Sequence, residues 1–259
     1  MKLTFSKYQG TGNDFILIDN RNGDSVLTNN QIEKLCHRRF GIGADGLIVL
    51  EKAEGFDFRM IYFNADGKEG SMCGNGGRCI VKFAHDAGIV NNEYRFIAID
   101  GPHDASLEMD GKVRLKMKDV EKIESHSNFD FVDTGSPHVV KQINSVEYFD
   151  VLNEGRAIRN SPSFKEKGVN VNFVEVLKDD RIYVRTYERG VEDETYSCGT
   201  GVTASALVHA HNERGFNHVD VETIGGTLYV EFEKTGDISF QNIWLAGPAT
   251  KVFSGEILL

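Results

Sequence analysis

Two stretches of the chain, FRMIYFNADGKEGSMCGNG at Phe58–Gly76 and YVRTYERGVEDETYSCGTG at Tyr183–Gly201, follow one plan. Each opens with residues typical of a strand, continues through a polar turn and closes on a cysteine followed by Gly-x-Gly. The cysteines, Cys73 and Cys198, lie 125 positions apart. The chain is therefore expected to contain one structural unit twice.

Three further pairs of segments recur in the same order in both halves, and one pair has the same offset of 125 positions. A long repeat of this kind indicates duplicated structural units, and units of about a hundred residues have the usual size of a domain. We expect an N-terminal domain at 1–120, a C-terminal duplicate at 121–248, and a return of about 249–259 to the first domain. The pairs are FIAIDG (96–101) with VETIGG (221–226), TGNDFILI (11–18) with TGSPHVVK (134–141), and, more loosely, GIGADGLIVL (41–50) with EKGVNVNFVEV (166–176).

The composition is that of a soluble globular protein. Of the 259 residues, 40% are hydrophobic and 26% are charged. The net charge is −10 and no basic cluster occurs, which argues against nucleic acid or a membrane surface as the main partner. No apolar run reaches the length of a membrane span, and the opening MKLTFSKYQG lacks the apolar core of a signal peptide, so we expect a cytoplasmic protein.

Helices are expected to be few and strands many. Thr28 and Gln31 form a capping box that predicts a helix ending at Gly41. A notably apolar helix follows each of the two cysteines, with Gly88 as the stop of the first and Gly215 beyond the end of the second, and each helix is expected to be buried by its own sheet. The fold class is α/β (α+β), with two similar strand-rich domains. The predicted strands are Phe15–Ile18, Leu47–Leu50, Phe58–Phe63, Tyr94–Ile99, Val139–Lys141, Asn172–Val176, Ile182–Tyr187 and Val219–Thr223.

The four cysteines fall into two kinds. Cys36 and Cys79 lie within helical patterns and are expected to be buried apolar residues. Cys73 and Cys198 stand just before a turn that opens a helix, where free backbone N–H groups favour negative charge. Such a position lowers the pKa of a thiol and makes it a usable base, and the same N–H groups can hold a substrate carboxylate.

Two equivalent bases suit the inversion of a carbon centre. One group removes a proton from one face of the carbon while the other delivers a proton to the opposite face. The chain contains no cofactor motif and no CxxC pair, so we expect neither cofactor nor metal, and the carbanion is expected to be stabilised by helix termini and hydrogen bonds.

Nucleotide-binding loops are the main competing interpretation of the glycines. GTGVTA at 199–204 fits a permissive dinucleotide pattern, but it follows polar ETYSC instead of a buried strand. GNGGRC at 74–79 lacks the third glycine, and neither segment has the Lys-Ser/Thr pair of an ATP-binding loop. A single Cys-Gly loop would most simply be structural, whereas two in matched positions favour chemistry.

The whole chain from about Lys7 resembles the diaminopimelate epimerase family. NADGKEGSMCGNGGR and YERGVEDETYSCGTG are similar to the two cysteine signatures of that family, and QGTGNDF, RRFGIGADGL, TGSPHVV and GVNVNF match further family segments in the family order. The resemblance implies two pseudo-symmetric domains, each a mixed, barrel-like sheet around a central helix. It also implies interconversion of LL- and meso-diaminopimelate without cofactor, in lysine and peptidoglycan precursor synthesis.

The resemblance also implies roles for individual residues. Cys73 and Cys198 would be the acid and the base. Backbone N–H groups at two positions after each cysteine would hold the reacting carboxylate, and further side chains would bind the rest of the substrate. The backbone N–H groups that would hold the reacting carboxylate are those of Gly74, Asn75, Gly199 and Thr200. The side chains that would bind the rest of the substrate are those of Asn13, Asn64, Asn170 and Arg189, with Arg189 on the distal carboxylate. Glu188 and His138 would orient the reacting amino group.

Simpler interpretations of these residues stay open. Asn13 and Asn64 stand in turn-forming segments, and His138, which follows a proline, could cap a strand. Arg189 could pair with Glu192 on the surface, an interaction of little energetic weight.

Three positions depart from the family pattern. Ser136 replaces an amide that can contact the distal end of the substrate, Gly46 replaces a glutamine found in some members, and Lys68 stands where serine is usual. They put the details of substrate binding in question but leave the cysteine pair unchanged.

Other functions remain to be separated from this one. They are an amino-acid racemase or isomerase of the same fold with another substrate, a redox or metal protein using Cys73, Cys79 and Cys198, and a binding protein that has lost turnover. The partner is expected to be a small molecule, diaminopimelate, and the sequence leaves a monomer and a homodimer open.

Overall fold

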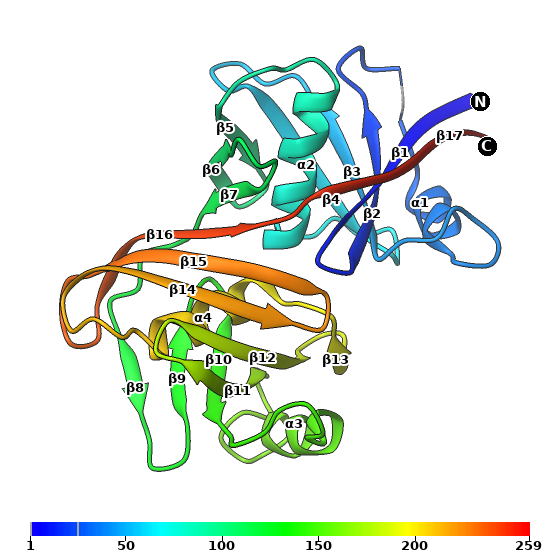
Figure 1. Ribbon diagram of the computed structural model, residues 1–259. Coiled ribbons are helices and arrows are strands. Elements are labelled where there is room, and N and C mark those ends of the chain that lie inside the picture. Colours follow the sequence, from blue (N-terminus) through cyan, green and yellow to red (C-terminus); the bar gives the residue numbers. More distant parts are fainter. Residues whose placement is uncertain (1, 25) are drawn as a thin grey trace. The chain divides into compact units, whose positions relative to one another are not determined.

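The computed structural model describes residues 2–24 and 26–259, which form two compact units (Figure 1). Unit 1 runs through Leu115 and is completed by Gly247–Leu259, and unit 2 is Lys116–Ala246. The domain boundaries expected from the sequence, at 120 and 248, remain a prediction.

Unit 1 is a sheet of mixed direction with two helices. Its elements are β1 (Lys2–Gly10), β2 (Asn13–Asp19), α1 (Asn29–Cys36), β3 (Gly46–Glu51), β4 (Phe58–Asn64), α2 (Gly74–Asp86), β5 (Glu93–Ala98), β6 (Gly101–Leu107), β7 (Val113–Lys116) and β17 (Thr250–Leu258). The strands pair in the order β17-β1-β2-β3-β4-β5-β6-β7, with β2–β3 and β4–β5 parallel and the other pairs antiparallel. Because β17 pairs with β1, the two ends of the chain lie side by side (Figure 1).

The helix α2 is the centre of unit 1. It packs against β1, β2, β3, β4, β6 and β17, and ten of its thirteen residues are buried. Apolar residues such as Ile80 and Phe83 account for part of this burial, and glycines in the first turn allow close approach of the strands. The helix ends at Asp86, and Gly88 has a φ of 94°, which agrees with the predicted stop.

Unit 2 has a similar order of elements, with one additional short strand, β13 (Asp193–Thr195), before its second helix. Its elements are β8 (Ile123–Ser125), β9 (Asp130–Asp133), β10 (Pro137–Gln142), α3 (Val151–Arg159), β11 (Asn170–Lys178), β12 (Arg181–Glu188), β13, α4 (Gly199–Val208), β14 (Gly215–Thr223), β15 (Gly226–Lys234) and β16 (Phe240–Gly247). The parallel pairs β10–β11 and β12–β14 correspond to β2–β3 and β4–β5. The helix α4 packs against β9, β10, β11, β12, β14 and β15, so each unit surrounds one buried helix.

Two details of the helices differ from the sequence prediction. The first helix starts with the predicted capping box of Thr28 and Gln31 but ends at Cys36 instead of Gly41, because His37 adopts an extended conformation and the next residues form turns. The helix α3 was not predicted. Asp150 caps it by accepting the N–H of Asn153, and Gly155 allows its backbone to pack against a strand.

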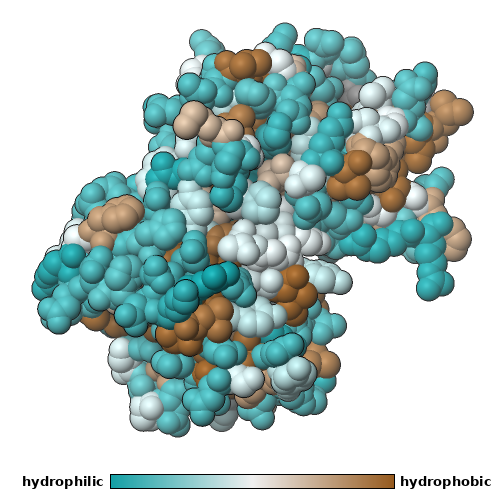
Figure 2. All heavy atoms as spheres, viewed as in Figure 1, coloured by the Kyte–Doolittle hydropathy of each residue, from teal (hydrophilic) through white to brown (hydrophobic). Residues whose placement is uncertain are grey.

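The surface is mainly polar. Figure 2 shows hydrophilic side chains over most of the visible face, with hydrophobic ones in small separate groups. Within residues 2–24 and 26–259, no helix is both long and apolar enough to span a bilayer.

Candidate active site

Cys73 stands at the N-terminus of α2, as the sequence predicted. Its backbone is extended, and its Sγ accepts the N–H of Gly76 at 3.2 Å. The side chain is partly exposed. The thiol of Cys73 therefore occupies a helix start, where the helix dipole favours a thiolate.

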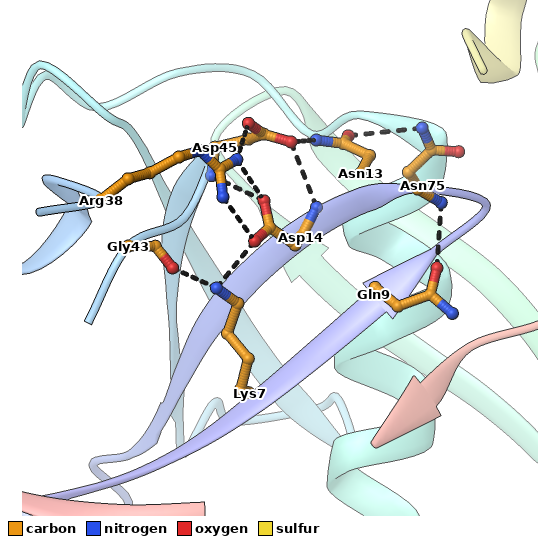
Figure 3. A network of polar contacts seen from close by, with 9 residues as sticks. Lys7, Gln9, Asn13, Asp14, Arg38, Gly43, Asp45 and Asn75 are labelled. Carbon is orange, nitrogen blue, oxygen red and sulfur yellow. Dashed lines mark hydrogen bonds and ion pairs between the residues drawn. The ribbon is translucent and has the colours of Figure 1, made fainter. Parts of the chain in front are cut away.

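Asn13 and Asn75 are brought together beside this loop (Figure 3). The Nδ2 of Asn75 donates to Oδ1 of Asn13 at 3.3 Å, and the Nδ2 of Asn13 donates to Asp45 at 2.7 Å. Because Asp45 accepts from the nitrogen, the amide of Asn13 has a defined orientation. Asp45 is thus a positioning residue that the sequence analysis missed, although it lies in the GIGAD segment.

An ionic cluster holds Asp45 in turn (Figure 3). Arg38 contacts Asp45 at 2.6 Å and Asp14 at 2.7 Å, and the buried Lys7 also pairs with Asp14 at 2.7 Å. Burial raises the pKa of Asp14, but hydrogen bonds from Arg38 and Lys7 outweigh it and hold this pKa well below its usual range. The cluster links β1, β2 and the loop before β3.

Asn64 lies at the end of β4 and is exposed. Its carbonyl accepts the N–H of Gly67 at 2.9 Å, so it begins the turn that its sequence suggested. A Cβ built on Gly70 would lie 2.9 Å from Nδ2 of Asn64, which places the loop before Cys73 against this amide.

Cys198 stands at the N-terminus of α4, matching Cys73. It is 8% exposed, and its Sγ lies 3.5 Å from Oγ1 of Thr200. Thr200 is held twice more: its carbonyl accepts from Thr134 at 2.9 Å, and its Oγ1 lies 2.9 Å from Nε2 of His138.

His138 is completely buried beneath this loop. Asn172 Nδ2 lies 3.1 Å from Nδ1 of His138, and Thr186 donates to Oδ1 of Asn172 at 2.9 Å. Because the Asn172 amide nitrogen can only donate, Nδ1 is an acceptor and the proton resides on Nε2, which donates to Thr200. The hydroxyl of Thr200 is then directed to donate toward Cys198.

The charge state of His138 follows from this burial. Desolvation, assisted by the positive charge of Arg189, lowers the pKa of His138 to about 3. The imidazole is therefore neutral at physiological pH. Asn172 and Thr186, which set its tautomer, were not recognised as site residues because their partners lie on neighbouring strands.

Asn170 and Arg189 meet at Ser136. Asn170 donates to Oγ of Ser136 at 2.9 Å and accepts the backbone N–H of Arg189 at 2.9 Å, while Nη2 of Arg189 lies 3.3 Å from the same Oγ. Glu192 pairs with Arg159 at 3.2 Å, whereas the guanidinium of Arg189 donates to Ser136 and to the carbonyl of Lys167.

Glu188 ends β12, next to Arg189. Its Oε2 accepts from Thr195 at 2.9 Å, which ties it to β13 just before the cysteine loop. Each predicted residue of the second half is therefore attached to the Cys198 loop or to the strand ends beside it.

Known proteins of one family are similar to this chain over almost its whole length. The family model described as diaminopimelate epimerase matches residues 5–123 and 131–252. A diaminopimelate epimerase of Flavobacterium psychrophilum is 49% identical over 97% of this chain and 98% of the relative, and one of Chlorobaculum tepidum is 46% identical over 96% and 99%. The chain belongs to the diaminopimelate epimerase family.

Solved structures of other families share the fold of this epimerase family member. A phenazine biosynthesis protein of the PhzF family from Bacillus anthracis superposes with a TM-score of 0.76 at 13% identity, over 100% of both chains. A probable proline racemase from Agrobacterium radiobacter gives 0.69 at 15% identity, over 99% of this chain and 93% of that one. The predicted family and the predicted α/β fold with two pseudo-symmetric halves are confirmed.

Proposed function

We propose that this protein is an isomerase that converts LL-diaminopimelate to meso-diaminopimelate without a cofactor. The observation that carries the proposal is the matched pair of cysteines, each at the N-terminus of a buried helix, in a chain of this family. The name of the family supplies the substrate, and the two helix N-termini supply the chemistry.

The reaction needs one thiolate and one thiol. The thiolate takes the proton from the α-carbon, leaving a carbanion, and the thiol on the other cysteine gives its proton to the opposite face. The backbone N–H groups of Gly74, Asn75, Gly199 and Thr200 stabilise the substrate carboxylate, whose negative charge grows as the carbanion forms. One proton has moved from carbon to sulfur and one from sulfur to carbon, so the substrate composition is unchanged.

Substrate selection is assigned to the strand ends. The guanidinium of Arg189 is exposed and has a planar fork that suits the distal carboxylate. Ser136 accepts from both Asn170 and Arg189, so its hydroxyl hydrogen remains available for a ligand. Asn13 and Asn64 are assigned to the substrate amino-acid groups, while Glu188 orients the reacting amino group and His138 acts through Thr200.

The cellular setting follows from the same family. The proposed product, meso-diaminopimelate, is a precursor of lysine and peptidoglycan. We therefore place the protein in the cytoplasm, with a small molecule as its partner.

The proposal is tested by incubating the purified protein with LL-diaminopimelate in deuterated water and analysing the isomers of diaminopimelate that are present. LL-diaminopimelate should give the meso isomer, with solvent deuterium in the product from the first turnovers and more slowly in recovered substrate. Equal early labelling of both pools would indicate a single base. L-lysine and L-proline serve as controls, and faster turnover of either would overturn the diaminopimelate assignment while leaving two-cysteine chemistry standing.

A further inference from the structure

The ring of Tyr62 fills a space that two glycines leave open beside the Cys73 loop. A Cβ built on Gly46, the buried first residue of β3, would lie 2.6 Å from Cε2 and 3.1 Å from the hydroxyl oxygen of Tyr62. A Cβ built on Gly70, in the loop before Cys73, would lie 3.2 Å from Cε1 of the same ring. Because both glycines lack a side chain, the two edges of the ring can lie directly against the backbone.

Tyr62 also lies on the face of the sheet that the first turn of α2 covers. A Cβ built on Gly76, in that turn, would lie 3.2 Å from Sγ of Cys73. The same Cβ would lie 3.3 Å from Cδ1 of Ile48 and 3.4 Å from Cε of Met60. Tyr62 pairs with Ile48 across β3 and β4 and follows Met60 by two residues, so these three side chains share one face. The ring of Tyr62 therefore lies on the same side of the sheet as the Cys73 thiol.

The amides assigned to the substrate in unit 1 lie at the same strand ends. The loop Cβ that would lie against the ring of Tyr62 would also lie 2.9 Å from Nδ2 of Asn64. Asp45, which orients the amide of Asn13, directly precedes Gly46 in the sequence. The hydroxyl of Tyr62 is therefore close to the side chains that we assign to the amino-acid groups of the substrate.

The ring of Tyr62 is held in place but remains accessible. Tyr62 is partly exposed, whereas Phe15, whose ring meets it edge-on at a centroid distance of 6.1 Å, is fully buried. The carbonyl of Tyr62 accepts the N–H of Gly70 at 2.9 Å, which ties the loop before the cysteine to the strand. A phenol hydroxyl both donates and accepts hydrogen bonds, so a contact within the protein still leaves it able to bind a ligand.

Unit 2 has the opposite distribution of side-chain size at this strand end. Gly46 begins β3, and Asn170 begins the corresponding strand β11. The residue two positions further along each strand pairs with Tyr62 in unit 1 and with Thr186 in unit 2. Unit 2 thus combines an amide with a small side chain, whereas unit 1 combines a glycine with a phenol.

We propose that Tyr62 is a substrate-binding residue whose hydroxyl takes the place of the polar side chain that Gly46 lacks. This rests on the proposed function in one respect, that diaminopimelate binds beside Cys73. The hydroxyl forms a hydrogen bond with an amino-acid end of diaminopimelate, where both the carboxylate and the ammonium group suit a side chain that donates and accepts. The polar group at this strand end is thereby supplied by β4 in unit 1 and by β11 in unit 2.

The test compares Tyr62→Phe with the unmodified protein in initial rates with LL-diaminopimelate. The substitution removes only the hydroxyl and keeps the ring between the two glycines, so circular dichroism should show an unchanged fold. KM should rise about tenfold or more, as expected for the loss of a hydrogen bond to a charged group, while kcat changes by less than about threefold. Tyr183→Phe, at a partly exposed tyrosine of β12, is the matched control and should change neither constant.

Fluorine NMR of the protein labelled with 3-fluorotyrosine examines the same contact without turnover rates. The signal that is absent from the Tyr62→Phe spectrum belongs to Tyr62, and saturating LL-diaminopimelate should shift it. The signal of Tyr183, assigned with Tyr183→Phe, should not move.

The outcomes separate the role of Tyr62 from the proposed function. If the unmodified protein is active but Tyr62→Phe leaves KM unchanged, or the Tyr62 signal does not respond to substrate, the role of Tyr62 is overturned and the proposed function stands. A fall in kcat at constant KM would overturn that role as well, because the loss of a binding contact raises KM. An unmodified protein that neither binds nor epimerises diaminopimelate would overturn the proposed function, and the role of Tyr62 with it.

Discussion

The two cysteine loops have the same backbone arrangement but different polar groups packed beneath them. In both, a cysteine with an extended backbone precedes a helix that is buried by its own sheet. Beneath Cys73 lies the buried guanidinium of Arg78, whereas beneath Cys198 lies the neutral imidazole of His138. The two loops therefore share the turn that presents a thiol, but they differ in the charge of the group packed beneath that turn.

The strand ends beside the two cysteine loops also carry different polar groups in the two units. Asp45 precedes β3 and Asn170 begins the corresponding strand β11, but Asp45 accepts a hydrogen bond from Asn13 whereas Asn170 donates one to Ser136. Asn64 and Arg189 are matched by the offset of 125 positions, so the positive charge is exposed at the strand end of unit 2 and buried under the helix of unit 1. Arg189 is therefore accessible to a ligand, as the role proposed for it on the distal carboxylate requires.

Removal of either thiol should have the largest effect. Cys73→Ala and Cys198→Ala are each expected to lower the epimerisation rate by about 10³-fold or more, because each proton transfer loses its donor or acceptor. Chiral analysis measures the loss. Cys36→Ala, in a buried cysteine of α1, is the control and should retain activity. Substantial epimerisation by either variant would show that the two cysteine loops are not both required.

Arg189→Lys should come next. Lysine keeps the charge but loses the paired geometry, so kcat/KM for LL-diaminopimelate is expected to fall about 10²-fold, within the ~2–5 kcal/mol of a desolvated charge pair. Initial rates check this, with Arg159→Lys as control since Arg159 pairs with Glu192 on the surface. An unchanged kcat/KM would remove Arg189 from the substrate site.

The glycines of the two loops should respond differently to alanine. A Cβ on Gly201 would overlap Oδ1 of Asn172, which is fixed by Thr186, so Gly201→Ala should destabilise the protein by about 2 kcal/mol. At Gly76 the nearest atoms are 3.2–3.4 Å away at side-chain ends, and the loss should stay below about 1 kcal/mol. Urea unfolding measures both, and equal losses would contradict the tighter packing of the Cys198 loop.

The neutral histidine should make unit 2 sensitive to acid. The pKa of His138 is about 3 in the folded protein, against an ordinary value of 6.5. Between these two pH values, the histidine is protonated in the unfolded chain but not in the folded protein. Stability is then full above pH 6.5 and falls as the pH decreases toward 3, by about 1.5 kcal/mol between 6.5 and 5. His138→Gln should remove that part of the slope in urea unfolding, whereas His126→Gln, at an exposed position, should not. An identical slope in both variants would show that His138 is not buried neutral.

The duplication, the two helix starts and the family could all be predicted from the order of the amino acids. The duplication and the family are patterns in the sequence itself. The capping box of Thr28, the strand periodicity before each cysteine and the glycines after it are governed by neighbours within a few residues. The helix α3 was missed because Val151 and Gly155 are its buried positions, a pattern too sparse to predict a helix.

The electrostatics of the candidate site depend on tertiary contacts that the sequence does not reveal. In the sequence, Arg78 is only one residue of a glycine-rich segment. In the structure it is buried and donates to Thr11 and Pro248, which are distant in sequence. Asn172 sets the tautomer of His138 because parallel pairing brings β10 and β11 together. Burial and hydrogen-bond direction depend on neighbours from several strands, and these fix which side chains are charged.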